Sequence, residues 1–448
     1  MKRSAWRFLW TAHDLRNRLL ITLLLLLIYR LASHVPVPGV DRTALAEIFA
    51  RGGAGAGLFT LLDLLSGGTV SNFSVLAMGV YPYITAQIIL QLLIPIIPAL
   101  QRRMEEDPRQ GREWMERWTY FVAIPMAALN SIGQIRLFEQ LAGGAQIVPN
   151  FGFTGANLLP TLSMILAMTA GTMFAIWLGE LISEYGIRNQ GLSLIIFAGI
   201  VSRFPSQIAQ LLADEQRRWV LLAFFLFITF VTIIVIVYVQ QGRRNVPVMY
   251  PGRRIGNRQS MPVKGTLPLM VNMAGMIPII FAQSILLFPA VIAQFFTSSS
   301  VGWISSLAIQ VQNLFGGNSS WYWLMYFVMV VAFSFFYTDV LFSQQNYGEN
   351  LKRSGAQVPG VTKGAPTQRY LTRVLRRITL PGAVFLGLVA VLPFLLGLLF
   401  PATGTGGNSL LTVSSVGLLI VVGVVRDTFF GLEAELKLRG YDETLLVH

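Results

Sequence analysis

The chain is a series of long apolar runs separated by short polar stretches. Three of the runs, 219–242, 265–338 and 378–425, contain no Asp, Glu, Lys or Arg. A helix that crosses a bilayer needs about 20 mostly apolar residues, so these runs have room for roughly one, two and two spans. The pattern predicts membrane-spanning helices, because a membrane β-barrel would show shorter segments of alternating polarity.

Apolar runs and the Pro and Gly breaks between them together predict ten membrane spans. We expect these spans at 19–35, 74–97, 118–138, 156–178, 190–212, 219–241, 266–292, 321–343, 374–400 and 408–428. If the N-terminus lies inside, 27 of the 34 lysines and arginines fall on the inner side of the membrane. This distribution obeys the positive-inside rule, so we expect both termini to be cytoplasmic.

Composition supports an all-α polytopic membrane protein and argues against an enzyme. Hydrophobic residues make up 54% of the chain and charged residues 12%, which is too apolar for a soluble globule. The absence of cysteine excludes disulfides and thiol catalysis, and the three scattered histidines do not suggest a metal site. Motifs of intramembrane hydrolysis, such as HExxH and GxSxG, are missing. We therefore expect no catalytic residues, no metal and no cofactor.

Two of the expected inner loops, 241–265 and 344–377, are unusually long and basic. Their Lys and Arg residues satisfy the positive-inside rule, and composition alone favours this simple interpretation. A topology signal, however, does not need protrusions of this length with repeated Pro and Gly. The second interpretation is a docking surface for a large anionic partner, such as ribosomal RNA or an acidic protein face.

A short apolar segment, "GLFTLLDLLSGG" (57–68), directly precedes the second expected span. It is too short to cross a bilayer. Backbone that is not part of a spanning helix is tolerated at membrane depth only where it is buried in protein or lines a cavity. The simple interpretation is a re-entrant structural loop, and the pattern alone leaves any other role of the segment open.

Four longer motifs resemble the SecY family, the channel subunits of bacterial protein translocases. They are "GGTVSNFSVLAMGVYPYITAQIILQLL", "GTMFAIWLGELISEYGI", "VNMAGMIPIIFAQSILLFPA" and "LKRSGAQVPGV". The resemblance implies two pseudo-symmetric five-helix halves, 1–212 and 213–448, around a central pore. It also implies that the channel conducts unfolded secretory polypeptides and releases hydrophobic segments sideways into the bilayer.

The same resemblance implies functional roles for individual residues. Residues 58–72 would form the plug of the closed pore, with Leu61, Leu62, Leu64, Leu65, Gly67 and Gly68. The pore ring would consist of Val80, Ile84, Leu192, Ile196, Ile280 and Thr412. The polar contact of the lateral gate would consist of Thr85, Gln91 and Asn272. We expect the Thr412 hydroxyl to bond back to the Asn408 carbonyl, although Thr412 facing a neighbouring helix is the alternative.

The implied partners are SecE, SecG, the SecA ATPase, the ribosome, signal peptides, unfolded preproteins and membrane lipids. The implied location is the inner (plasma) membrane. The partner-docking residues would be Arg243, Arg244, Arg253, Arg254, Arg258, Lys352, Arg353 and Lys363. Two details depart from the family pattern. Thr362 stands where the family usually has an arginine, and "IRNQGLS" (187–193) carries an extra residue that allows Leu192 to shift by one position.

Two other classes of function are weighed against the channel. A secondary transporter or lipid flippase would need an ionisable group in the middle of the membrane, whereas the acids here lie at the ends of the expected spans. A non-conducting assembly scaffold is the third possibility, and channel currents after deletion of the plug would exclude it.

Overall fold

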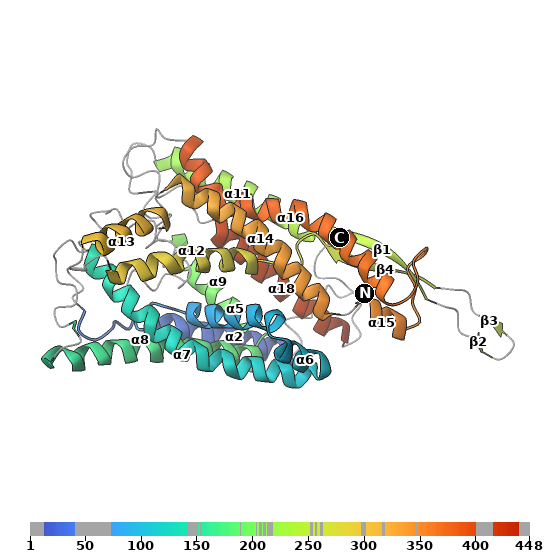
Figure 1. The fold of residues 1–448 in the computed structure, drawn as a ribbon, viewed down its shortest axis with the longest axis horizontal. Coiled ribbons are helices and arrows are strands. Elements are labelled where there is room, and N and C mark those ends of the chain that lie inside the picture. The colour runs from blue at the N-terminus through green and yellow to red at the C-terminus, as the bar shows by residue number, and fades with distance from the viewer. Residues whose placement is uncertain are drawn as a thin grey trace. The chain divides into compact units, whose positions relative to one another are not determined.

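The structure is a computed structural model that is mostly helical (Figure 1). It describes residues 13–40, 73–141, 151–152, 155–188, 190–202, 204–205, 208, 212, 218–250, 254–255, 258–259, 263–296, 302–315, 319–345, 347–399 and 415–438. The chain divides into two compact units. The first comprises Met1–Ala223, Ser284–Tyr322 and Ile420–His448, and the second comprises Phe224–Gln283 and Trp323–Leu419.

The first unit is built on a group of packed helices. Its elements are α2 (His13–Ala32), α5 (Tyr81–Ile96), α6 (Pro98–Glu106), α7 (Pro108–Leu141), the short 3-10 helix η1 (Gly155–Asn157), α8 (Leu158–Tyr185), α9 (Gly191–Val201) and α13 (Gly302–Phe315). Helix α8 contacts α2, α7 and α9, and α5 contacts α7. Helix α8 is therefore the centre of this packing.

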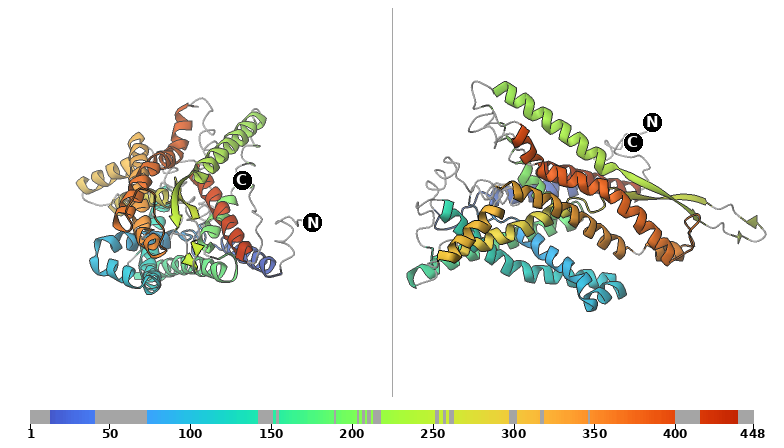
Figure 2. Two further views of the ribbon diagram at one scale, coloured as in Figure 1. Left: turned by 90° about the vertical axis from the view of Figure 1, so that its right-hand side faces the viewer. Right: turned by 45° about the horizontal axis from the view of Figure 1, so that its top comes forward.

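The second unit combines helices with a β-hairpin. It contains α15 (Tyr347–Arg353), α16 (Ala365–Leu399) and strands β1 (Arg243–Tyr250), β2 (Arg254–Ile255), β3 (Arg258–Gln259) and β4 (Val263–Met270). Four helices contribute residues to both units: α11 (Arg218–Gln241), α12 (Ile277–Phe296), α14 (Ser320–Gln344) and α18 (Ser415–Leu438). Helix α11 runs directly into β1 (Figure 2).

Glycines allow the segments around α8 to approach closely. A Cβ placed on Gly171 would fall on the backbone carbonyl of Val75, and one placed on Gly191 would fall on the carbonyl of Gly179. On Gly179 itself, a Cβ would come within 2.8 Å of the Leu192 side chain. Small residues that let backbones meet are the usual device for packing helices in a membrane.

Helix α11 differs because most of its surface is not covered by protein. Trp219 and Tyr238, near its two ends, are 68% and 81% exposed. They are 19 residues apart, which corresponds to about 28 Å along a helix and matches the roughly 30 Å hydrocarbon core of a bilayer. Aromatic side chains at both ends of an apolar helix are typical of membrane–water interfaces. These features identify α11 as a membrane span.

Among the described residues, four helices are long and apolar enough to cross a membrane. They are Leu158–Tyr185, Leu222–Gln241, Ser320–Arg353 and Ala365–Leu392. Residues 191–201 and 277–290 form shorter apolar helices. The prediction of an all-α polytopic membrane protein is therefore confirmed at the level of class, while the count of ten spans stays a prediction.

Several expected span boundaries differ from the helices. The sequence pattern places the seventh span at 266–292, but the helix begins at Ile277, because 263–270 instead pairs with 243–250 as a β-strand. The pattern starts the ninth span at residue 374, but α16 begins at Ala365, and the third, expected from 118, lies in a helix that begins at Pro108. Hydropathy marks only the part of a helix that lies in lipid, so it underestimates the length of a helix that continues into water.

The register of the hairpin explains how it accommodates two prolines. Met249 exchanges both backbone hydrogen bonds with Gln357, at 2.8 and 2.9 Å, so its N–H and C=O point away from β4. The direction of the backbone N–H and C=O groups alternates along a strand, so those of residue 247 also point away from the partner strand. The same holds for residue 268, which lies opposite Asn245. Pro247 and Pro268 therefore cost the ladder no hydrogen bond and leave each edge with one fewer donor for further strands.

Candidate functional site: a constriction, a polar gate contact and a basic docking platform

Two of the predicted pore-ring residues lie at the start of α5. Val80 is the residue that precedes the helix, is 1% exposed, and accepts a hydrogen bond from the Ile84 amide at 3.1 Å. Residues 74–80, expected to be the first turns of the span, instead belong to a series of non-helical turns over 73–80, in which Phe73 and Gly79 have positive φ. These turns lead the chain into α5 and place Val80 directly before its first turn.

The next pair, Leu192 and Ile196, lies one helical turn apart on α9. Leu192 is half-buried, and its Cδ2 atom lies over Gly179 of α8. Ile196 is buried at 9% exposure. The Leu192 side chain fills the space that the missing side chain of Gly179 leaves, so the position of Leu192 depends on the contact between α8 and α9.

Two predicted residues of the second unit lie in the first turn of α12 and in the turn that precedes it. Ile280 is buried, and its amide bonds to the Met276 carbonyl in the first turn of the helix. Asn272, expected inside a span, lies in the turn between β4 and α12. Its side-chain amide donates to the Gly275 carbonyl at 3.1 Å, and Gly275 has φ +63°. Asn272 therefore stabilises the turn that starts α12.

A polar contact between α5 and α12 could not be anticipated from the sequence. The Tyr81 hydroxyl forms side-chain hydrogen bonds with Ser284 of α12 and with Thr85. Tyr322 of α14, fully buried, lies near enough to interact with Tyr81 electrostatically. The hydroxyl of Thr85 donates to the Tyr81 carbonyl at 2.7 Å. Of the predicted gate residues, Thr85 belongs to this contact, and Gln91 lies half-buried about two turns further along α5.

The remaining pore predictions fall outside the described residues. These are the whole plug segment 58–72, with its leucines and glycines, and the sixth ring position, Thr412. Their roles stay predictions.

The two long basic loops fold together in the second unit. Residues of the hairpin, of α14, of α15, of the segment 354–364 and of α16 share one hydrophobic core: Val246, Val248, Leu269, Phe342, Leu351, Ala356, Val358, Leu371 and Leu375. We call the described residues of 243–270 and 347–377 the docking platform, after the role that the sequence predicts for them. Strands β2 and β3, which lie between β1 and β4 in the chain, pair with each other in antiparallel orientation (Figure 1).

Polar contacts join distant parts of the docking platform. The Gly348 amide donates to Gln368 Oε1 at 2.7 Å, which ties the start of α15 to α16. A Cβ on Gly348 would come within 2.9 Å of Gln368 Cβ and of the Gly364 carbonyl, so glycine is required by the close approach. The backbone exchange between Met249 and Gln357 joins the first loop to the second. The platform is therefore held at several points and is not a pair of independent loops.

All of the predicted docking residues whose side chains are described are exposed on this platform. Those on β1, on α15 and in the connection to α16 are Arg243, Arg244, Lys352, Arg353 and Lys363. Arg254 and Arg258 lie in β2 and β3, at the end of the hairpin, and Arg253 lies outside the described residues. Thr362 is exposed beside Lys363, and its carbonyl accepts a hydrogen bond from the Thr367 hydroxyl.

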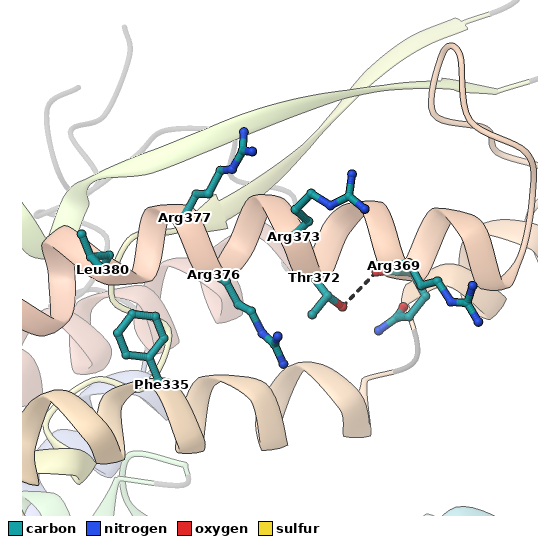
Figure 3. A pocket seen from close by; sticks show the side chains of 8 residues that line it. Phe335, Arg369, Thr372, Arg373, Arg376, Arg377 and Leu380 are labelled. Carbon is teal, nitrogen blue, oxygen red and sulfur yellow. Dashed lines mark hydrogen bonds between the residues drawn. The ribbon is translucent and has the colours of Figure 1, made fainter.

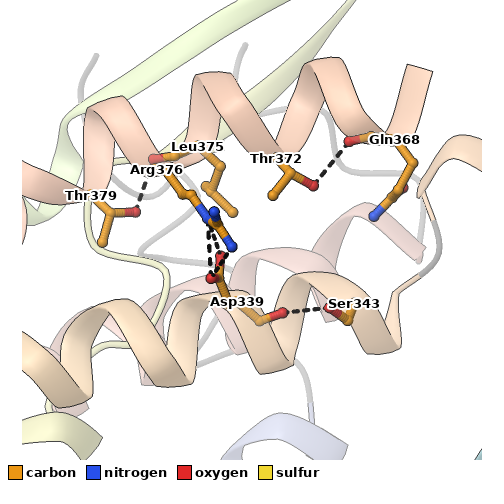
Figure 4. A network of polar contacts seen from close by, with 7 residues as sticks. All are labelled: Asp339, Ser343, Gln368, Thr372, Leu375, Arg376 and Thr379. Atoms are coloured by element: carbon orange, nitrogen blue, oxygen red, sulfur yellow. Dashed lines mark hydrogen bonds and ion pairs between the residues drawn. The ribbon is translucent and has the colours of Figure 1, made fainter. Parts of the chain in front are cut away.

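An ion pair between α14 and α16 is also absent from the sequence predictions. Arg376 Nη2 lies 2.8 Å and Nε lies 3.1 Å from Asp339 Oδ2 (Figure 4). The partners are 37 residues apart, and the sequence gives no signal for such a pairing. The spacing of Arg369, Arg373 and Arg376, by contrast, is the four-and-three spacing of one helix face and could have predicted that the helix of the ninth span begins before residue 374.

Side chains that could hold a metal do not gather in the described part of the chain. No group of three or more His, Asp or Glu side chains is found there. The fold and the charge distribution define a polytopic helical membrane protein whose second unit carries a basic platform.

Comparisons with known proteins narrow this class. The family model of SecY matches residues 74–429. Relatives named protein translocase subunit SecY include those of Streptomyces galbus, 35% identical with 96% of both chains covered, and of Aquifex aeolicus, 36% identical with 97% of both chains covered. The chain belongs to the SecY family.

Solved structures agree with this fold. One titled as the structure of a protein-conducting channel has a TM-score of 0.61 and 18% identity, covering 94% of this chain and 92% of that one. Another, which concerns the plug domain of the SecY protein, has a TM-score of 0.60 and 17% identity over the same shares.

Proposed function

We propose that this chain is the pore-forming subunit of a protein translocase. It conducts unfolded secretory polypeptides across the membrane and releases hydrophobic segments sideways into lipid. The observation that carries this proposal is its similarity, over nearly the full length of both chains, to relatives named protein translocase subunit SecY. It acts as a channel subunit and performs no catalysis of its own.

The proposed path through the membrane is closed by a ring of side chains that are aliphatic apart from Thr412. The ring consists of Val80, Ile84, Leu192, Ile196, Ile280 and Thr412, and the plug consists of residues 58–72. Aliphatic groups can close around a moving chain without binding it, and a dry constriction opposes the flow of ions. The burial of Val80, Ile196 and Ile280 is consistent with this role.

The proposed lateral gate is closed by polar contacts between span two and spans seven and eight. Thr85, Gln91 and Asn272 are its members by family resemblance, and the Tyr81–Ser284 hydrogen bond supplies a direct contact between α5 and α12. A hydrogen bond between transmembrane helices is worth only about 0.6–2 kcal/mol. Such a contact keeps the gate closed at rest and yields when a hydrophobic segment inserts.

The docking platform is the proposed binding surface for the partners that drive translocation. Its exposed basic residues suit the SecA ATPase and ribosomal RNA, and SecE and SecG complete the complex within the membrane. In this arrangement the platform and both termini face the cytoplasm, and the chain lies in the inner (plasma) membrane. The excess of Lys and Arg in the loops on that side supports the orientation.

A cross-linking experiment tests the channel and its gate together. The chain has no native cysteine, so Thr85→Cys with Asn272→Cys introduces one defined pair. In proteoliposomes that contain the full complex and its ATPase, we expect oxidation to stop the accumulation of protease-protected precursor. Reduction should restore it.

Each single-cysteine variant serves as the control and should translocate normally under oxidising conditions. Efficient cross-linking with undiminished translocation would overturn the gate assignment. Failure of the reduced and the single-cysteine proteins to translocate any precursor, in a complex of correct composition, would overturn the proposed function itself.

A further inference from the structure

A groove of about 700 Å³ runs along α16 beside α14 in the second unit (Figure 3). It is charged toward the start of α16 and apolar further along the helix. The arginines that line it are Arg369, Arg373, Arg376 and Arg377, and its apolar lining includes Phe335 and Leu380. The two kinds of lining make this an amphipathic groove and not a simple charged surface.

Only one of the four arginines is neutralised by a described residue. Arg376 points toward α14 and pairs with Asp339. Arg369, Arg373 and Arg377 are exposed and make no ion pair with any described residue. The groove therefore carries three arginines without a counter-charge among the described residues, which favours an anionic ligand.

The position of the groove along α16 indicates the depth of the ligand in the membrane. Arg377 is the last charged residue before the uncharged run 378–425. Leu380, 57% exposed, is seven residues beyond Arg373, about 10 Å along the helix axis. The change from arginine to leucine thus falls where phospholipid headgroups give way to acyl chains.

We propose that this groove binds an anionic phospholipid from the leaflet on the docking-platform side. The phosphate is held by Arg369, Arg373 and Arg377, and an acyl chain lies over Phe335 and Leu380. Basic pockets between transmembrane helices are a recognised arrangement for binding anionic headgroups. The bidentate Asp339 pair holds Arg376 against α14 and limits the positive charge of the groove.

Because α16 belongs both to the groove and to the docking platform, a bound lipid would stabilise the platform from its membrane side. Gln368 lines the groove and also accepts the Gly348 hydrogen bond. The lipid site would therefore couple the composition of the membrane to the order of the partner-docking surface.

Native mass spectrometry of the full chain in its complex, titrated with phosphatidylglycerol in neutral detergent, tests the proposal. Replacing Arg369, Arg373 and Arg377 by Gln should weaken binding on the order of 100-fold, since each juxtamembrane arginine contributes about fivefold. Asp339→Asn should strengthen binding by about fivefold because it adds one net positive charge. A mutation that merely disrupted the fold would not strengthen binding.

The matched control replaces Arg102, Arg109 and Arg117 by Gln, which changes the charge equally on exposed residues of α6 and α7. Its affinity should stay within about twofold of the original chain, because nearby charge alone is screened. Equal losses in both triple variants, or equal binding of phosphatidylcholine, would overturn the site. If inorganic phosphate bound in place of the lipid, the groove would be a phosphate site. If a short RNA duplex displaced the lipid at equal charge concentration, the groove would be a nucleic-acid site. Either result would overturn the lipid proposal.

Discussion

Helices α8 and α11 are both long and apolar, yet they are covered by protein to very different extents. In their most apolar windows α8 is 56% buried and α11 is 17% buried, although α11 is the more hydrophobic of the two. Helix α8 contains Gly171 and Gly179 and receives Gly191, whereas α11 contains no glycine. Lipid is as apolar as leucine, so size and shape, and not hydrophobicity, decide which helix packs against protein.

This difference separates two roles for a membrane helix. Helix α8 positions other segments, since Val75 and Leu192 both lie against its glycines. Helix α11 has one buried stripe, formed by Phe225, Thr232, Ile236 and Gln240, and turns its remaining surface outward. A helix of the first kind fixes the neighbourhood of the proposed constriction, and one of the second kind anchors the chain in the bilayer.

The largest expected effect comes from adding a single methyl group at Gly191. Gly191→Ala places its Cβ on the backbone carbonyl of Gly179, which cannot move without separating α8 from α9. We expect a loss of about 3 kcal/mol or more in the free energy of unfolding, at the upper end of overpacking costs. Thermal unfolding in detergent, followed by tryptophan fluorescence, measures the change.

The matched control is Gly431→Ala on α18, where a Cβ meets no described atom within 4 Å. It should be neutral or stabilising by up to about 1 kcal/mol, because alanine is the better helix former. Equal stability of the two variants would show that the close contact between α8 and α9 does not hold the fold together.

The second prediction compares two isoleucines of α11 that are two residues apart. Ile236 is 0% exposed and Ile234 is 50% exposed. Ile236→Ala should cost about 1–3 kcal/mol, toward the low end for buried residues, because lipid supplies no hydrophobic driving force between helices. Ile234→Ala should cost less than about 0.5 kcal/mol. Equal losses in the same unfolding assay would mean that the outer surface of α11 is also packed against protein.

The class of the protein and most of its helical segments could be predicted from the sequence, because long uncharged runs are rare outside membrane-spanning helices. The hairpin could not, because residues 266–270 of its second strand continue into the uncharged run of the expected span, and the strand pairs with a segment 13–27 residues away. The contacts of Tyr81 with Ser284 and of Asp339 with Arg376 could not be predicted either. They depend on which helices are neighbours, and local pattern carries no information about that.

Sequence reasoning was more useful for the surface than for the interior of the site. The exposed basic residues of the docking platform follow from charge alone, and those whose side chains are described are exposed. Asn272, in contrast, is predicted to be a mid-span residue because its neighbours are apolar, and it proves to stabilise a turn. A polar residue within an apolar run looks the same in the sequence whether it lies in the middle of a span or in a turn before a helix.

The third prediction concerns the hydrogen bond between Gly348 of α15 and Gln368 of α16, which links two elements by a polar contact. Gln368→Ala removes the acceptor of the Gly348 amide and should cost about 1 kcal/mol. Thr372→Val, one turn away, removes only a hydroxyl that bonds back to the Gln368 carbonyl, and it should cost less than about 0.5 kcal/mol. Hydrogen exchange of the Gly348 amide is the direct measurement. Unchanged protection in Gln368→Ala would contradict the assigned hydrogen bond.

The smallest expected effect concerns Thr85. Its side chain either closes the proposed gate itself or serves only as a second partner of the Tyr81 phenol, and substitutions can separate these two roles. Its hydroxyl proton is used by the Tyr81 carbonyl, so the side chain can only accept from another helix. Thr85→Val removes one partner of the Tyr81 phenol but leaves Ser284, so stability should change by less than about 0.5 kcal/mol. Ser284→Ala, which breaks the link to α12, should loosen the gate more and admit precursors with weakened signal segments in the proteoliposome assay. Thr85→Ser keeps both hydrogen bonds and should match the original chain. If Thr85→Val admitted these precursors as readily as Ser284→Ala, the contact that closes the gate would lie at Thr85 itself, as the family resemblance first indicated, and Tyr81 would serve only to position it.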